Sequence, residues 1–317
     1  GYGSVFGHDE KDKNYWRKLR KNNIGDINLD NMADFRVAII GLGLIGGSLA
    51  YAMRGFKNAQ IVGCDMNEKT RNMALKTGAV NMAYEKAGDA IENSDLVIIC
   101  TYPEDIPKIV SENFGRFKAS AVLTDVCGVK TNISKKIKEA LPEAVDYVGS
   151  HPMAGKEVDG FSNASDELFW MTGFIICPIS NSKTESIELI KELAKYIGAT
   201  RIAINTPDEH DEIIAYTSDL MHISAAALCL KPHPKMNTAY TAGAFRDCTR
   251  IAQINPDLWC ELFLENAENT INEIDGFVDS LGQLRDVIAN KDEKALHELL
   301  TKVRENKRLM QNKTAKI

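Results

Sequence analysis

The sequence predicts an α/β Rossmann-type N-terminal domain with a parallel-rich sheet, followed by an all-α C-terminal domain. Short β-branched runs alternate with helix-like segments from Phe35 onward, which is the pattern of βα units. A glycine-rich turn follows the first run directly, and the strand-like runs stop at Pro207. Successive apolar residues, as in Val37-Ala38-Ile39-Ile40, favour strands that helices cover on both faces.

The elements follow in order along the chain. Strands are expected at residues 36–40, 60–65, 81–84 (weakly), 96–100, 121–125 and 146–150, then a strand at 173–178, a helix at 184–196 and a strand at 200–204. Helices alone are expected at 208–230, 238–252, 256–289 and 291–312, with a loop at Lys231-Pro232-His233-Pro234. The expected organisation is a flexible leader at 1–31, with Met32 as a candidate natural start, a Rossmann domain at 32–205 and a helical domain at 206–317.

Composition narrows the class of protein. Hydrophobic residues make up 44% and charged residues 26%, so a packed globular protein is expected. The net charge of −6 gives no general attraction for nucleic acid or an anionic membrane, and no run approaches the ~18 apolar residues that span a bilayer. The seven cysteines are scattered, without a C-x-x-C pair and in odd number, which argues against a disulfide framework and a zinc site and favours reduced thiols in the cytoplasm. No metal is expected.

The loop Gly41-Leu42-Gly43-Leu44-Ile45-Gly46 predicts a dinucleotide site. Gly41 permits the tight turn, Gly43 lets the backbone approach a pyrophosphate, and Gly46 lets helix and strand pack closely. Leu44 and Ile45 open the helix whose N-terminus would face the phosphates. A glycine turn without a ligand is the alternative, but the strand, the helix and a spaced acid all occur where the motif requires them.

That acid is Asp65, 19 residues beyond Gly46, which can bind a ribose 2′-hydroxyl and would repel a 2′-phosphate. The expected cofactor is therefore NAD rather than NADP. Arg71 is a nearby base, and it lies well past the turn. Thr101, after the strand at 96–100, is a further candidate for binding the cofactor.

His151 is the first catalytic candidate. It follows a predicted strand at the sheet edge where ligands of open α/β sheets bind. A histidine there can take a proton from an alcohol while hydride leaves the same carbon. A structural histidine is the alternative, which the neighbouring motifs disfavour.

The helix at 208–230 supplies a second candidate, His222. It shares a helical face with small and polar residues, namely Asp211, Ala215, Ser218 and Ala226. This face either lines a ligand site or is simply solvated. His210 is rotated from His222 by about 120° and need not join it.

Arg246 and Arg250 lie one helical turn apart. A guanidinium binds a carboxylate in a bidentate fork, so these arginines predict an acidic substrate. Pairing of either one with Asp247 or Glu261 is the alternative.

Together these motifs resemble the prephenate and arogenate dehydrogenase family over residues 35 to 280. The residues that carry the resemblance are those at 41–48, 150–157 and 245–252, His210-Asp211 with His222, Trp259, and those at 263–266. The resemblance implies NAD-dependent oxidative decarboxylation of prephenate on the route to tyrosine, with an active site between the domains and a homodimer formed through the helical domain.

The resemblance also implies roles for single residues. His151 would be the hydrogen-bond partner or base for the ring hydroxyl, and His222 and Arg250 would bind substrate. Glu157 would support the site electrostatically, and Arg246 would add positive potential. Family members often carry a serine where this chain has Gly128, so that hydroxyl contact is not available here.

Three alternatives remain open from the sequence. Arogenate differs from prephenate by an amine in place of the side-chain ketone, and Asp219 is a candidate partner for that amine. A 3-hydroxyacid dehydrogenase would usually rely on a lysine in the helical domain, where this chain has His222 and Arg250. A catalytically silent NAD-binding regulator is disfavoured because His151 is intact. The apolar stripe along 256–289 favours a homodimer.

Overall fold

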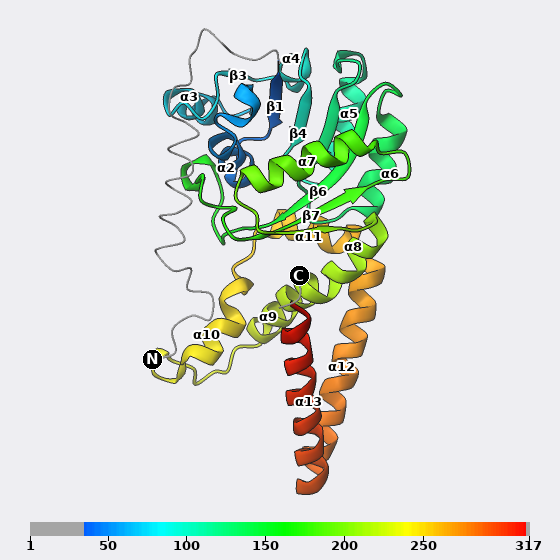
Figure 1. Cartoon of the computed structure of the whole chain (residues 1–317). Helices are drawn as coiled ribbons and strands as arrows, with labels where there is room; N and C mark the ends of the chain where they lie inside the picture. Colours follow the sequence, from blue (N-terminus) through cyan, green and yellow to red (C-terminus); the bar gives the residue numbers. More distant parts are fainter. Residues whose placement is uncertain (1–34, 315–317) are drawn as a thin grey trace.

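A computed structural model of the chain describes residues 35–314, so the expected leader at 1–31 lies outside the described residues. An eight-stranded sheet dominates the first part, in the order β3-β2-β1-β4-β5-β6-β7-β8. The strands are β1 Arg36–Ile40, β2 Gln60–Cys64, β3 Met82–Tyr84, β4 Leu96–Ile99, β5 Val122–Asp125, β6 Asp146–Met153, β7 Gly173–Pro178 and β8 Arg201–Ile204. This arrangement confirms the Rossmann-type prediction (Figure 1).

The strands from β3 to β6 run parallel, and only the β6–β7 pair is antiparallel. The antiparallel pairing extends β6 beyond the predicted end at residue 150, because Pro152 and Met153 pair with Phe174 and Gly173. His151 therefore lies inside the strand, opposite Ile175, and not just past its end.

Helices cover both faces of the sheet, as the continuous apolar runs predict. Side chains alternate along each strand, so Val37 and Ile39 face one layer while Ala38 and Ile40 face the other. The first layer holds α2 Leu44–Ala52, α3 Glu68–Lys76 and α7 Thr184–Tyr196. The second holds α4 Ala87–Ile91, α5 Asp105–Glu112 and α6 Thr131–Ala140. Short 3-10 turns occur at Phe56–Asn58, Phe114–Arg116 and Phe161–Asn163.

After β8 the described chain is helical, as predicted. The elements are α8 Pro207–Ile214, a π-helical turn Ala215–Asp219, α9 Leu220–Leu230, a 3-10 turn Thr238–Tyr240, α10 Gly243–Thr249, a 3-10 turn Arg250–Ala252, α11 Pro256–Glu265, α12 Ala267–Ala289 and α13 Glu293–Thr314. The single helix expected at 256–289 is broken at Asn266, which ends α11 and precedes α12. The π-helical turn interrupts the regular spacing expected between 208 and 230.

The helix Pro207–Leu230 is long and apolar enough, by length and composition, to cross a membrane. This differs from the expectation of no such stretch, because the apolar residues are spread along the helix and not gathered in one run. Two carboxylates on it, Asp211 and Asp219, are buried inside the protein. Only 28% of the most apolar 18-residue stretch of this helix is buried inside the protein.

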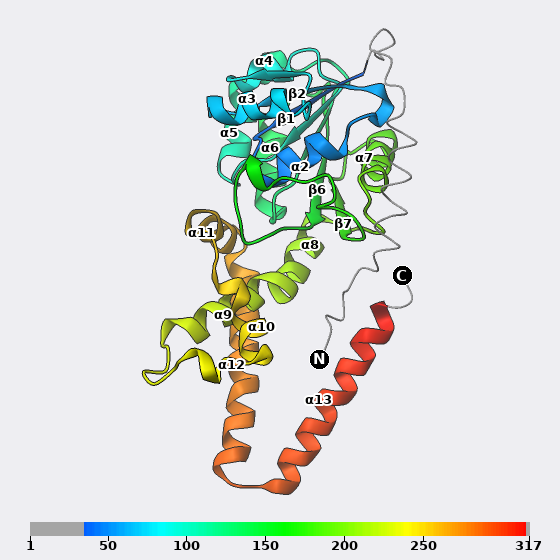
Figure 2. The ribbon, with the colours of Figure 1, turned by 90° about the vertical axis from the view of Figure 1, so that its left-hand side faces the viewer.

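Helices α12 and α13 extend away from the sheet and diverge from their connecting turn (Figure 2). Large apolar side chains are exposed along both helices, at Ile271, Phe277, Val278, Leu281, Ile288, Leu300, Val303 and Leu309. In water such a surface favours contact with another apolar surface.

Candidate active site

The glycine loop has the geometry of a dinucleotide site. Gly41 has φ +90°, and a Cβ there would lie 2.8 Å from the carbonyl oxygen of Cys100. A Cβ on Gly46 would lie 1.9 Å from the carbonyl oxygen of Gly41, so close packing of α2 on β1 requires that glycine. A Cβ on Gly43 meets nothing within 4 Å. The space beside Gly43 is open to a ligand, as the motif predicts.

Thr101 gives a second sign of a ligand. Its Oγ1 is buried and lacks a hydrogen-bond partner among the described residues. Its Cγ2 lies 3.2 Å from where a Cβ of Gly41 would be, which places this threonine against the glycine loop. A buried hydroxyl without a partner is unfavourable, and a bound cofactor would relieve that.

Asp65 follows β2 and lies next to the glycine loop. Its carboxylate accepts hydrogen bonds from the Leu42 N–H at 3.0 Å and from the Asn67 N–H at 2.8 Å. Arg71 lies closer to it than the sequence suggested, since its guanidinium donates to the carbonyl oxygens of Asp65 and Met66. Arg71 is therefore engaged with the backbone, and the carboxylate of Asp65 remains the charged group suited to a ribose. Together with the glycines and Thr101, these residues fit a dinucleotide.

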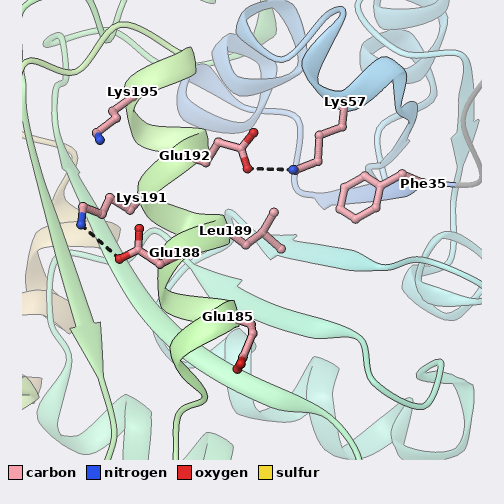
Figure 3. Close-up of a pocket in the computed structure, with 8 residues that line it drawn as sticks. All are labelled: Phe35, Lys57, Glu185, Glu188, Leu189, Lys191, Glu192 and Lys195. Atoms are coloured by element: carbon pink, nitrogen blue, oxygen red, sulfur yellow. Dashed lines mark hydrogen bonds and ion pairs between the residues drawn. The ribbon is translucent and has the colours of Figure 1, made fainter.

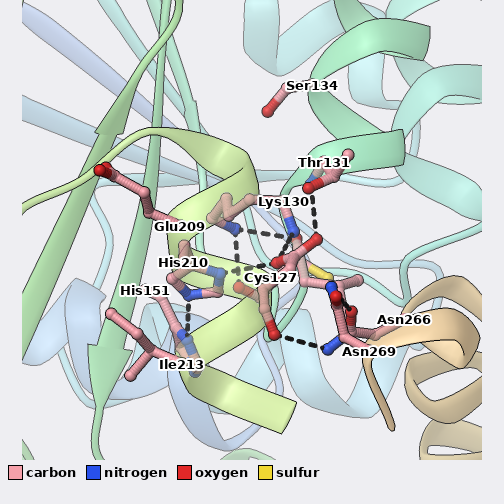
Figure 4. A network of polar contacts seen from close by, with 12 residues as sticks. Cys127, Lys130, Thr131, Ser134, His151, Glu209, His210, Ile213, Asn266 and Asn269 are labelled. Atoms are coloured by element: carbon pink, nitrogen blue, oxygen red, sulfur yellow. Dashed lines mark hydrogen bonds and ion pairs between the residues drawn. The ribbon is translucent and has the colours of Figure 1, made fainter. Parts of the chain in front are cut away.

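His151 forms part of a chain of polar contacts that the sequence did not reveal. Its Nδ1 lies 2.9 Å from Nε2 of His210, and Nδ1 of His210 lies 2.7 Å from Oδ1 of Asp211 (Figure 4). Helical periodicity in the sequence related His210 only to His222, on the same helix. It gave no sign that His210 would meet His151, which comes from β6. The capping box of Thr206 and Glu209 fixes the start of α8 and so places His210 in its first turns.

Asp211 joins the helical part to the sheet. Its carboxylate accepts hydrogen bonds from the backbone N–H groups of Lys130 at 2.8 Å and Thr131 at 2.7 Å, at the start of α6. The N-terminal N–H groups of a helix carry partial positive charge and favour an anion. Despite the burial of Asp211, hydrogen bonds from His210, Thr131 and Lys130 lower the pKa of its carboxyl, so Asp211 is charged at neutral pH.

A buried ion pair lies directly behind this chain. Nζ of Lys130 is 2.6 Å from Oδ1 of Asp125, and both side chains are fully buried. The Tyr147 hydroxyl donates to Oδ2 of Asp125 at 2.7 Å, and Nζ of Lys130 also donates to the Cys127 carbonyl. These bonds satisfy the two charges and fix the loop between β5 and α6.

The electrostatics of this region keep both histidines neutral. Burial lowers the pKa of His151 well below 6.5, and the nearby His210 and Lys130 lower it further. Burial also lowers the pKa of His210, although Asp211 opposes that effect. A neutral imidazole at pH 7 can accept a proton, which suits His151 as a base.

Gly128 lies beside His151. A Cβ on Gly128 would be 3.9 Å from Cε1 of His151 and 3.2 Å from Cδ2 of Leu262 on α11. A larger residue there would require a small movement of Leu262.

The remaining predicted residues are His222 on α9, Arg246 on α10, Arg250 in the following 3-10 turn, and Glu157. His222 donates from Nδ1 to the Ser218 carbonyl at 2.9 Å, and its ring stacks on Trp259 with centroids 3.7 Å apart. Burial lowers the pKa of His222. Arg250 forms an ion pair with Glu157, and not with Asp247 or Glu261 as considered from the sequence. Arg246 is exposed, one helical turn before Arg250.

Asp219 does not face this group of residues. It is 2% exposed, and its Oδ2 accepts hydrogen bonds from Asn266 at 3.0 Å and Thr270 at 3.1 Å. Its suggested role as a partner for a substrate amine is therefore wrong, because its carboxylate points into the helical core.

A separate groove of about 610 Å³ lies on α7. It is lined by charged side chains of that helix with Phe35 and Lys57, and ion pairs such as Lys57 with Glu192 cross it (Figure 3). None of its described lining residues belongs to the dinucleotide loop or to the histidine chain. Among residues 35–314, moreover, no group of three or more His, Cys, Asp or Glu side chains is placed to hold a metal ion.

Comparison with known proteins identifies the family. The family model described as the prephenate dehydrogenase nucleotide-binding domain matches residues 49–203, and the one described as the prephenate dehydrogenase dimerization domain matches residues 206–302. The chain belongs to the prephenate dehydrogenase family.

Individual relatives agree with this assignment. The chain is 31% identical over 263 residues to the cyclohexadienyl dehydrogenase of Zymomonas mobilis, covering 81% of this chain and 89% of the relative. It is 28% identical to the prephenate dehydrogenase of Bacillus subtilis, covering 81% of this chain and 71% of the relative. The structure of prephenate dehydrogenase from A. aeolicus in complex with hydroxyphenyl propionate and NAD+ has a TM-score of 0.78 at 29% identity, covering 87% of this chain and 98% of that one.

Proposed function

We propose that the chain catalyses the NAD-dependent oxidative decarboxylation of prephenate to 4-hydroxyphenylpyruvate and CO2. It is an oxidoreductase of the prephenate dehydrogenase family, and NAD is its cofactor. In this reaction the ring hydroxyl loses its proton, and the carbon that bears it loses a hydride. The bond to the ring carboxylate then breaks, CO2 leaves, and the electron pair makes the ring aromatic as a phenolate, which takes up a proton to give the hydroxyl of the product.

The placement of His151 is the observation that carries the proposal. It is a neutral, half-buried histidine on β6, in the same sheet as β1 and β4, whose carboxyl ends carry Gly41 and Thr101. Ligands of open α/β sheets bind in the crevice at these strand ends. His151 is thus placed to take the proton of the ring hydroxyl.

The cofactor would be held by the glycine loop and the residues next to it, namely Gly41, Gly43, Leu44, Ile45, Gly46, Asp65 and Thr101. NAD+ supplies the hydride acceptor when it is bound. Thr101 has a buried hydroxyl free to bond the cofactor, and the Asp65 carboxylate favours a ribose hydroxyl over a phosphate.

The substrate carboxylates would be bound from the helical domain. Arg250 would bind a carboxylate with its guanidinium, and Arg246 adds positive charge one turn away. His222 donates Nδ1–H to the Ser218 carbonyl, so its Nε2 would bind a substrate carboxylate in the protonated form, which the negative charge of the substrate favours. Glu157 currently pairs with Arg250, and a substrate carboxylate would take its place. Glu157 and Arg250 both influence the pKa of His222, which places all three within electrostatic reach of one another.

Arogenate is the second candidate substrate. The similarity to a cyclohexadienyl dehydrogenase, at 31% identity, keeps it open. With Asp219 buried in the helical core, Glu157 is the carboxylate beside Arg250 that a substrate amine could meet.

The assembly proposed here is a homodimer formed through the helical domain, with the domain boundary at 205/206. Exposed apolar residues on α12 and α13 support this, and so does the similarity of residues 206–302 to a dimerization domain. The seven cysteines are free, of which Cys64, Cys127 and Cys177 are buried, which supports a reducing, cytoplasmic location.

The proposal is tested by following the formation of NADH or NADPH by absorbance. Prephenate and arogenate are each assayed with NAD+ and with NADP+. Turnover of prephenate with NAD+ is expected. His151→Asn should lower kcat by roughly 10² to 10⁴ with little change in NAD+ binding. His297→Asn, at an exposed position on α13, is the matched control and should leave kcat unchanged. An unaltered kcat in His151→Asn would remove His151 from the mechanism.

A further inference from the structure

A continuous chain of hydrogen bonds links the start of α6 to His151. It runs from the N–H groups of Lys130 and Thr131 to the Asp211 carboxylate, then to His210 and on to His151. Asp211 and His210 are each 1% exposed, and the bond between them is buried, while the bond from His210 to His151 is part-buried. The donor and acceptor of each bond can be assigned from chemistry alone.

The assignment starts at Asp211. An ionised carboxylate accepts hydrogen bonds and cannot donate them. Its two backbone partners are donors, and they lie at a helix N-terminus that favours the charged form. Nδ1 of His210, at 2.7 Å from Oδ1, must therefore carry its proton and donate it to Asp211.

The second ring follows from the first. A neutral histidine has one N–H, so His210 with its proton on Nδ1 presents a lone pair at Nε2. That lone pair lies 2.9 Å from Nδ1 of His151. Nδ1 of His151 must then be the donor, and its Nε2 carries the free lone pair.

We propose that His210 and Asp211 are positioning residues that hold His151 in the Nδ1–H tautomer, so that Nε2 is the atom that accepts the proton of the substrate hydroxyl. The proposal rests on the proposed function and names the atom that serves it. In the step itself the substrate O–H bond breaks and a His151 Nε2–H bond forms. His151 then carries a positive charge, and its Nδ1–H remains bonded to His210.

The surrounding charges agree with this division of roles. Lys130 is the cation that acts on both rings, and it opposes protonation of each one. The Asp125 carboxylate neutralises Lys130 at 2.6 Å. Asp211 is the anion in direct contact with His210. The negative charge that would stabilise a protonated His151 thus reaches it through His210.

Three variants of His210 separate positioning from simple packing. His210→Asn places an amide near the position of Nδ1, so it keeps the bond to Asp211 and loses the acceptor for His151. His210→Gln reaches the position of Nε2, so its amide oxygen can accept from His151. His210→Phe keeps the ring shape and loses both bonds. We expect kcat with prephenate to fall roughly 10²-fold or more in His210→Asn and His210→Phe, because the wrong tautomer lacks a base. His210→Gln should recover most of the loss, and the KM for NAD+ should stay constant.

Nitrogen-15 NMR of the side chains reads the tautomer directly, without substrate. The chain has six histidines, so the His151 signals can be assigned by comparison with His151→Asn. The wild type should show a protonated Nδ1 and an unprotonated Nε2 at His151, and His210→Asn should shift the population toward Nε2–H. An Nε2–H tautomer in the wild type would overturn the proposal, as would equal activity of His210→Asn and His210→Gln.

The tautomer measurement also separates this proposal from the proposed function. If neither prephenate nor arogenate were turned over, the function would fail while the NMR result still stood. If turnover were normal with His151 in the other tautomer, the positioning role alone would fail.

Discussion

The burial of the Asp219 carboxyl predicts that a substitution at this position stabilises the protein. This carboxyl is 2% exposed and has two hydrogen-bond donors, Asn266 and Thr270, but no cation in contact among the described residues. Burial raises its pKa from 3.8 to about 6. At ~1.4 kcal/mol per pKa unit, keeping it charged in the folded state costs about 3 kcal/mol. Asp219→Asn removes the charge and keeps an oxygen for both donors, so it should stabilise the fold by up to about 3 kcal/mol at pH 8.

The pH dependence of unfolding provides an independent check on the sign of this stabilisation. A carboxyl with a raised folded pKa contributes its full stability below pH 3.8 and loses it as pH rises through about 6. At pH 5 the wild type has regained roughly half, about 1.4 kcal/mol. The advantage of Asp219→Asn should therefore shrink from about 3 kcal/mol at pH 8 to about half that at pH 5. Urea unfolding followed by circular dichroism at the two pH values measures it.

Asp211→Asn on the same helix is the matched control. Its carboxyl has a lowered pKa and accepts from Lys130, Thr131 and His210. Loss of its charge should destabilise the protein by about 1.5–3 kcal/mol at pH 8. Should Asp219→Asn destabilise the protein as much as Asp211→Asn, or its effect be the same at pH 5 and pH 8, the electrostatic account of Asp219 would be refuted.

Three further predictions follow from the geometry. Gly43→Ala adds a Cβ that meets no protein atom within 4 Å, so its melting temperature should match the wild type while calorimetry shows NAD+ binding weakened about tenfold or more. Unchanged affinity would mean that the pyrophosphate does not approach Gly43. Arg250→Ala should raise the KM for prephenate by roughly 10- to 150-fold, which corresponds to the loss of a charged hydrogen bond of about 1.5–3 kcal/mol. Arg246→Ala should raise it less, and steady-state kinetics that gave both variants the same KM would contradict the assignment. Lys130→Met leaves Asp125 buried without its cation and should lower the free energy of unfolding in urea by about 3–5 kcal/mol. Lys136→Met, at the exposed pair with Glu265, should change that free energy by under about 1 kcal/mol. Similar losses in the two variants would show that burial does not set the strength of the pair.

The fold was predictable because its signals are local. Apolar runs gave the strands, and Gly41, Gly43 and Gly46 fixed the first βα turn through contacts with nearby backbone. The helix at 184–196 begins and ends where its pattern predicts. The predicted bounds were wrong where tertiary contacts determine the end of an element. Pairing with β7 lengthens β6, and the Asn266 side chain bonds Asp211 and Asp219 at the break between α11 and α12.

The site was only partly predictable for a related reason. His151 and Arg250 stand in motifs that name their chemistry, but their partners come from distant segments. His210 is 59 residues from His151, and Glu157 is 93 residues from Arg250. Helical periodicity relates residues only within one helix. It therefore gave the angle between His210 and His222 and could not reveal a contact between His210 and a strand. The π-helical turn at Ala215–Asp219 further changes which residues of that helix share a face.

The contact between His151 and His210 crosses from the sheet domain to the helical domain. A hinge motion that lengthened this 2.9 Å contact would open the crevice and at the same time remove the acceptor that holds the base in its working tautomer. Opening for release and loss of basicity would then be a single event. An open enzyme would retain its cofactor loop intact yet be unable to deprotonate a substrate, so chemistry would be confined to the closed arrangement.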